Sequence, residues 1–101
     1  MVADSSFQIV NARLVARADG TQVEFVNAHE LEYRKAGRTI RLEAERHIAA
    51  DGAPDGRDIV LPSQASWLDG APLLENERSI LINDLLEAAP ALRTKLRIVG
   101  V

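Results

Sequence analysis

The two histidines, His29 and His47, are the side chains best suited to metal binding or acid–base chemistry. His29 lies in the connection Asn27-Ala28-His29, and His47 follows Glu45 near the end of a predicted strand. Glu45 and His47 share one face of that strand, but a metal site needs three or four ligands that converge on one point. The chain has no Cys, which excludes cysteine-ligated zinc and disulfides. We therefore predict no metal and no cofactor, and keep a small metal-dependent enzyme using Glu45 and His47 as one alternative.

The other residue types that support catalysis occur in no recognisable pattern. No serine lies in a Gly-x-Ser-x-Gly sequence, and the glycines fall in turns and loops rather than in a phosphate-binding loop. Carboxylates are plentiful, but acid–base catalysis needs two titrating groups held together in a cleft. The sequence therefore predicts a protein that is not an enzyme.

Charge is unevenly distributed along the 101 residues, which carry 12 Lys and Arg against 15 Asp and Glu. Residues 51–92 hold most of the acids, and this acidic half would suit a basic protein partner, although a solubilising surface is the simpler interpretation. The low pI of about 5.3 and the few aromatic residues argue against nucleic-acid binding.

The aliphatic runs are short, as in Ile80-Leu81-Ile82, whereas a membrane span needs about 20 apolar residues. The N-terminus has an acid at Asp4 and no apolar signal region. We therefore expect no membrane association and a cytoplasmic protein of bacterial style.

The first half of the chain is typical of two β-hairpins. Asp19-Gly20 suits a two-residue hairpin turn, which predicts Leu14 opposite Phe25 and Ala16 opposite Val23. The apolar alternation changes phase upstream, so we expect a bulge or break near Val10-Asn11.

The second hairpin turns at Ala36-Gly37. This turn places Tyr33 opposite Ile40 and Leu31 opposite Leu42. A slip by one residue would bring Glu32 opposite Ile40, so the apolar pattern determines this register.

The second half predicts a short strand, a helix and a terminal strand. Asp51–Gly56 is rich in turn residues, 58–61 is typical of a strand, and 63–75 is irregular. A helix over 75–89 has a broad apolar face and ends at Pro90, and residues 96–101 form a closing strand. The order predicts a single α+β domain over 1–101, an antiparallel β-meander sheet of about five to six strands with one C-terminal helix packed on one face.

The stretch from Trp67 to Ile80 contains the apolar residues that the core explains least. Trp67 is either a core plug at the end of the sheet or a partner contact, since Trp is frequent at interface hot spots. On a helical wheel, Ile80 and Asp84 lie away from the apolar face. The predicted partner-binding residues are Trp67, Asp69, Glu75, Glu77, Ile80 and Asp84. The terminal strand offers another contact, because an edge strand can pair with its counterpart in a second copy.

Short motifs in this part of the chain resemble a known family. They are Ala44-Glu45-Arg46, Trp67 followed by Asp69-Gly70-Ala71-Pro72, and Glu77-Arg78 with Ile80-Leu81 and Asp84 before a closing strand. Over about 28–101 the chain resembles the family numbered 74 among the predicted immunity proteins of polymorphic toxin systems. It departs from that family at Leu74, where a helix-capping Ser is expected, and in the hairpin at 7–26. The resemblance implies a non-catalytic domain that neutralises a toxin by binding it.

The sequence as a whole predicts a non-catalytic protein-interaction domain, an immunity-like inhibitor in the case the resemblance describes. The alternative is a homo-oligomeric structural domain, joined through the terminal strand or through the side of the helix that carries Ile80.

Overall fold

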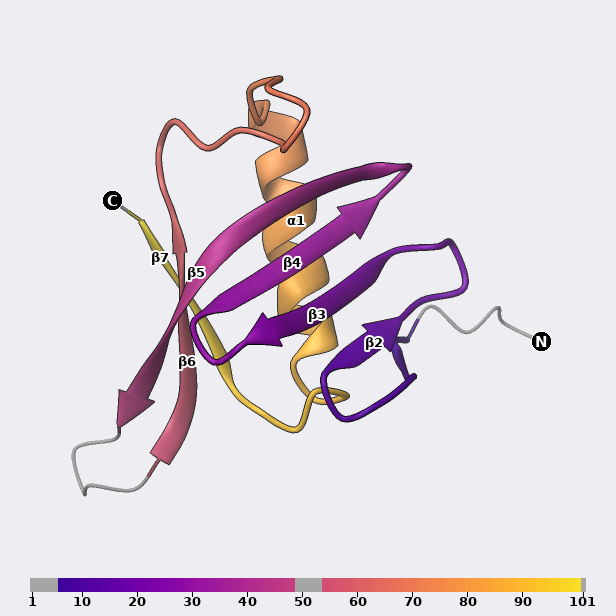
Figure 1. Cartoon of the computed structure of the whole chain (residues 1–101), viewed down its shortest axis with the longest axis vertical. Helices are drawn as coiled ribbons and strands as arrows, with labels where there is room; N and C mark the ends of the chain where they lie inside the picture. Colours follow the sequence, from indigo (N-terminus) through magenta and orange to yellow (C-terminus); the bar gives the residue numbers. More distant parts are fainter. Residues whose placement is uncertain (1–5, 49–53, 101) are drawn as a thin grey trace.

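A computed structural model describes residues 6–48 and 54–100, which form one seven-stranded sheet and one helix (Figure 1). The elements are β1 (Gln8–Ile9), β2 (Leu14–Ala16), β3 (Gln22–Asn27), β4 (Glu30–Lys35), β5 (Arg38–Ile48), β6 (Pro54–Leu61), α1 (Glu75–Ala88) and β7 (Leu96–Gly100). The strands follow one another in the sheet in chain order. The predicted α+β class and the C-terminal helix are confirmed. In the described residues the strand count is higher than predicted, because the first predicted strand divides into β1 and β2.

The division between β1 and β2 is a tight reversal of the chain. The Asn11 side-chain carbonyl accepts the backbone N–H groups of Arg13 (2.9 Å) and Leu14 (3.0 Å). The backbone N–H of Val10 donates to the Leu14 carbonyl at 2.9 Å. The expected break near Val10-Asn11 is therefore a turn, after which β2 runs antiparallel to β1.

The first hairpin has a register one residue away from the prediction. Gly20 donates to the Arg17 carbonyl (2.9 Å) and Arg17 donates to the Thr21 carbonyl (2.8 Å), so the loop has three residues. Gly20 adopts a φ of 92°, as the last residue of such loops commonly does. Val15 consequently lies opposite Val23, with both side chains fully buried. The predicted pairs of Leu14 with Phe25 and of Ala16 with Val23 are wrong.

The second hairpin has the predicted register. Ala36 and Gly37 both have positive φ, 53° and 77°, as a two-residue type I′ turn requires. Tyr33 lies opposite Ile40 and Leu31 opposite Leu42, and all four side chains are buried.

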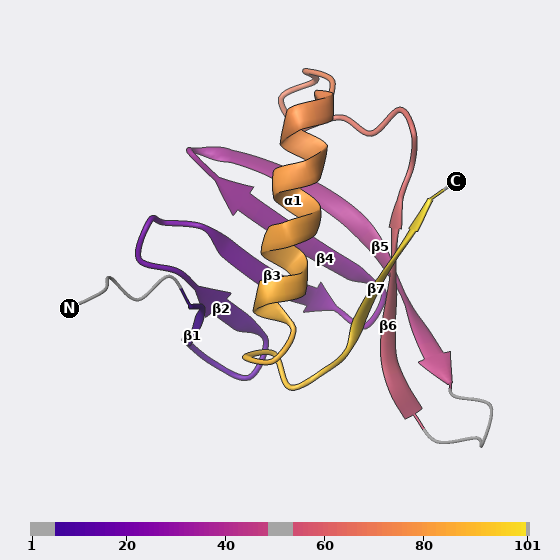
Figure 2. The ribbon, with the colours of Figure 1, turned by 180° about the vertical axis from the view of Figure 1, so that it is seen from behind.

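The helix covers one face of the sheet, as Figure 2 shows from the helix side. Its side chains Leu81, Leu85 and Ala88 are fully buried in the same cluster as Val23 and Ile40 of the sheet. The helix begins after Leu74, whose backbone N–H donates to the Glu77 carboxylate at 3.0 Å. Glu77 thus satisfies one of the free N–H groups at the helix start even though no serine caps it.

The uncovered face of the sheet is held together by ion pairs. Glu32 of β4 accepts hydrogen bonds from Arg34 (2.8 Å) and from Arg41 on the neighbouring strand. These two arginines, Arg41 foremost, hold the pKa of Glu32 below its ordinary value. This face therefore needs no second layer of helices to bury it.

The last strand, β7, departs from the meander because it runs parallel to β6. The connection between them is α1 itself, which returns the chain to the end of the sheet where β6 began (Figure 1). The predicted turn-rich segment Asp51–Gly56 lies partly outside the described residues, and Pro54, Asp55 and Gly56 begin β6. Residue 101 also lies outside them. α1 is too short and too polar to cross a membrane, and it is the one helix among the described residues.

Candidate functional site

A surface groove of about 280 Å³ lies between α1 and the turn that joins β4 to β5. Three parts of the chain meet here, namely the β4–β5 hairpin, the segment 62–74 and the first half of α1. The side chains that line the groove are Tyr33, Lys35, Ala36, Arg38, Trp67, Asn76, Glu77 and Ile80. We call this hollow the Trp67 groove.

Trp67 is fixed in place from several directions. Its indole N–H donates to the Glu77 carboxylate at 3.1 Å, and the Arg38 guanidinium lies 4.5 Å from its ring centre. The Tyr33 ring lies 6.3 Å away, centre to centre. Only 5 % of Trp67 is exposed, which confirms the interpretation of this residue as a core plug. Trp67 therefore contributes the floor of the groove rather than a protruding contact.

Arg38 joins the acidic residues beside Trp67. It donates to Asp69 at 3.2 Å and to Glu77 at 3.0 Å. The pKa of Glu77 is lowered by the Leu74 backbone N–H and the Trp67 indole. The pKa of Asp69 is lowered by the Ala71 backbone N–H and by Arg38. Both carboxylates are thus ionised and already engaged by groups of the same chain.

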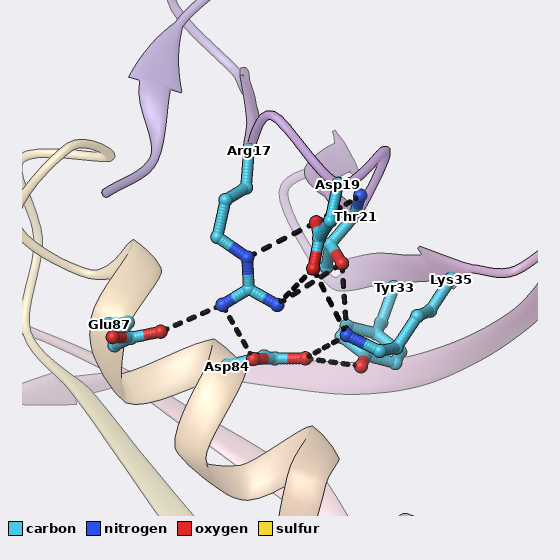
Figure 3. Close-up of polar contacts among 7 residues, drawn as sticks. All are labelled: Arg17, Asp19, Thr21, Tyr33, Lys35, Asp84 and Glu87. Atoms are coloured by element: carbon cyan, nitrogen blue, oxygen red, sulfur yellow. Dashed lines mark hydrogen bonds and ion pairs between the residues drawn. The ribbon is translucent and has the colours of Figure 1, made fainter. Parts of the chain in front are cut away.

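Behind the groove, Asp84 is the centre of a buried polar cluster (Figure 3). One carboxylate oxygen accepts from Arg17 at 2.8 Å. The other accepts from the Tyr33 hydroxyl at 2.6 Å and from Lys35 at 3.3 Å. The Asp84 side chain is only 6 % exposed, so the prediction that it faces away from the core is wrong. A helical wheel cannot show that two distant side chains reach Asp84. Tyr33 reaches it from β4, and Arg17 reaches it from the loop that follows β2.

Arg17 connects this cluster to the first hairpin. It forms a two-point contact with Asp19 (3.2 and 2.9 Å), pairs with Glu87 at 2.8 Å, and stacks on Phe7 with 5.1 Å to the ring centre. The contact with Asp19 raises the pKa of Arg17 and lowers the pKa of Asp19. Burial and the neighbouring Asp84 raise the pKa of Tyr33, so its hydroxyl stays protonated and donates. The cluster therefore fastens the hairpin to α1.

The structure brings most of the predicted partner-binding residues to one place. Trp67, Glu77 and Ile80 line the groove, and Asp69 reaches its edge through Arg38. Ile80 is 43 % exposed. Glu75 is exposed at the start of α1, outside the groove lining, and Asp84 is buried behind it.

Five residues of the groove lining were not predicted as site residues, namely Tyr33, Lys35, Ala36, Arg38 and Asn76. Lys35 and Arg38 flank the turn at Ala36-Gly37, whose position was predicted correctly. The signal that could have found them is the irregular segment around Trp67, which must cover one end of the sheet.

The residues considered for metal binding were His29, Glu45 and His47. Among the described residues, no group of three or more His, Cys, Asp or Glu is placed to hold a metal ion. His29 lies in the turn between β3 and β4, where its backbone N–H donates to the Asn27 side-chain carbonyl at 2.8 Å. Glu45 lies opposite Asp58 and is exposed. The side chain of His47 lies outside the described part of the chain.

Comparison with protein-family models, with curated proteins and with solved structures gave no match. The resemblance to the immunity family therefore stays a prediction.

Proposed function

We propose that this chain is a non-catalytic protein-interaction domain that holds an apolar side chain of its partner in the Trp67 groove. The observation that supports this proposal is a preformed hollow with an aromatic floor and a half-exposed apolar wall, Ile80. In the immunity-like form of the proposal, the partner is a toxin and binding occludes its active surface.

The size of the groove suits a single side chain of a partner protein. Pockets for drug-sized ligands have volumes of about 300–1,000 Å³ and enclose most of the ligand. The Trp67 groove, at about 280 Å³, lies at the lower end of that range. Interface hot spots are commonly single anchor residues that fill a pocket of this kind.

The groove is also preorganised. Trp67 is fixed by its contacts with Glu77 and Arg38, so it has little freedom to lose when a partner binds. Binding to a rigid surface avoids the entropic cost of ordering side chains at the interface.

Charge at the groove would orient the partner rather than attract it strongly. The acids Asp69, Glu77 and Asp84 are each paired with a cation of this chain. Among the predicted partner-binding acids, Glu75 is the one best placed to steer a basic partner, because it is exposed at the start of α1. The apolar anchor is therefore expected to provide most of the affinity.

The test is affinity capture from the organism that encodes the chain, quantified by mass spectrometry. Ile80→Glu places a charge in the groove wall and should reduce capture of the specific partner at least tenfold. Leu86→Glu is the matched control, since Leu86 is 48 % exposed and lies about 120° around the same helix. Equal capture by wild type and both variants, or equal loss in both, would overturn the proposal.

A further inference from the structure

The strand β7 leaves one long edge of the sheet open. It is the last strand of the sheet, and no strand of the described residues lies on its other side (Figure 2). It has five residues, Leu96–Gly100, and contains no proline. Such an edge presents backbone N–H and C=O groups that another strand can pair with.

The hydrogen-bond pattern identifies the groups on the open edge. The Arg57 N–H donates to the Lys95 carbonyl at 2.9 Å, while Arg57 lies opposite Leu96 in the parallel pair. Odd-numbered residues of β7 therefore direct their backbone groups toward β6. The backbone groups of Leu96, Ile98 and Gly100 consequently point to the open side.

We propose that a second copy of this chain pairs with β7, forming an antiparallel β7–β7 dimer centred on Ile98. In this register Ile98 lies opposite its counterpart, and Leu96 lies opposite Gly100 of the other copy. All three outward-pointing residues then form hydrogen-bonded pairs, which allows about six new backbone hydrogen bonds. A shift by one residue would bring outward groups opposite inward ones and forms none of these pairs.

The side chains of β7 suit this self-pairing. Ile98 is only partly buried and packs on the core, so opposing Ile98 side chains extend the core across the twofold axis. Arg97 lies opposite Val99 of the other copy, which avoids directly opposed like charges. Arg97 also forms a two-point contact with Asp58 of β6, at 2.9 and 2.8 Å, so it leans along the sheet instead of covering the edge.

The other edge of the sheet favours a closed dimer over an open chain of molecules. That edge is β1, which has only two residues, Gln8–Ile9. Head-to-tail growth would require β1 of one copy to pair with β7 of the next. The two residues of β1 can pair with only part of the five-residue strand β7. A twofold pairing of β7 with itself uses the same surface on both copies and is complete after one step.

The dimer should be weak and concentration-dependent. Five residues span about 17 Å of strand. A stable interface of standard size buries about 1,200 Å² or more, and an edge contact of this length buries less than that. We therefore expect a monomer of 11.0 kDa in dilute solution and a rising average mass toward twice that value at millimolar concentration.

The experiment is sedimentation equilibrium from about 10 μM to 1 mM, combined with amide hydrogen exchange at both ends of that range. The amides of Leu96, Ile98 and Gly100 should gain protection at high concentration. The amides of Arg97 and Val99, which point toward β6, should be protected throughout. A constant monomer mass at 1 mM overturns the proposal, and so does a dimer in which the amides of β7 stay unprotected.

Two variants at one position separate pairing from folding. Gly100→Pro removes an outward N–H and should lower the association constant at least tenfold. Gly100→Ala keeps that N–H, and its added Cβ meets no atom within 4 Å, so this variant should dimerise like wild type. Circular dichroism is used to check that each variant is folded. Equal association of the two folded variants would contradict pairing through this edge.

Discussion

Asp84 and Glu87 both bind Arg17 at 2.8 Å from the same helix, yet their surroundings differ. The Asp84 side chain is 6 % exposed and the Glu87 side chain is 52 % exposed. Removing one partner of a buried pair leaves a desolvated charge without compensation, at a cost of about 3–5 kcal/mol. An exposed pair is worth about 1 kcal/mol or less.

Because Arg17 keeps Asp19 and Glu87 as partners, we predict that Asp84→Asn lowers the free energy of unfolding by about 2–3 kcal/mol. Glu87→Gln, the matched control, should lower it by less than about 1 kcal/mol. Urea unfolding followed by circular dichroism measures both. Similar losses in the two variants would show that Arg17 is not anchored mainly through Asp84.

The acid sensitivity of the fold follows from its paired carboxylates. The pKa values of Asp19, Glu32, Asp69 and Glu77 are all lowered in the folded chain. As the pH falls below about 4.5, the unfolded chain takes up protons on these groups before the folded chain does. The stability that they contribute is therefore present above their ordinary pKa values and is lost as the pH falls through the folded values.

Glu32→Gln tests the contribution of one carboxylate to this loss of stability at low pH. We predict a lower Tm than wild type at pH 7, because Arg34 and Arg41 lose their shared carboxylate. The difference should shrink as the pH falls through the lowered pKa of Glu32, because wild type then protonates the same carboxylate. Thermal unfolding at a series of pH values measures it, and a difference that stays constant with pH would refute the assignment.

At the scale of elements, Gly56 is required for β7 to dock on β6. Its φ is 134°, and an added Cβ would lie 2.1 Å from the Lys95 carbonyl oxygen. Gly56→Ala should therefore separate the start of β7 from β6 and expose the Arg57 amide, which donates to that carbonyl. Hydrogen exchange should show a loss of protection at Arg57 of at least tenfold. Gly100→Ala is the control, and unchanged protection of Arg57 in the Gly56 variant would contradict the prediction.

The contrast between the two hairpins shows how much of the fold the sequence could predict. Around Ala36-Gly37, Tyr33 and Ile40 alternate with charged residues, so only one register buries the apolar side chains. Around Asp19-Gly20, apolar residues occupy both faces of the strands, and the pattern could not distinguish a two-residue loop from a three-residue one. The loop length is decided by contacts of Asp19 with Arg17 and Thr21.

The candidate site was predictable only in part for a similar reason. The odd position of Ile80 and the lone Trp67 indicated the region of the chain in which the groove lies. The role of Asp84 was missed, because it depends on Tyr33, 51 positions away in the sequence, and on Arg17, 67 positions away. The parallel pairing of β7 with β6 was missed too. The apolar pattern of a strand does not indicate whether the strand runs parallel or antiparallel to its neighbour.

At the scale of the whole molecule, the Trp67 groove and the β7 edge are separate surfaces. The groove adjoins the β4–β5 turn, whereas β7 lies at the opposite side of the molecule (Figure 1). β5 and β6 lie between β4 and β7 in the sheet. The two proposed contacts therefore share no residue, and the element that adjoins both of them is α1.

Independence of the two surfaces is itself a prediction. Effects of distant substitutions without shared partners add within about 0.5 kcal/mol. Ile80→Glu should leave the association constant of the β7 dimer unchanged, and Gly100→Pro should leave partner capture unchanged. Sedimentation and quantitative capture, applied to both single variants and the double variant, measure this. A loss of capture in Gly100→Pro but not in Gly100→Ala would show instead that the partner binds the dimer, since pairing two grooves in one assembly strengthens binding without any new contact in either groove.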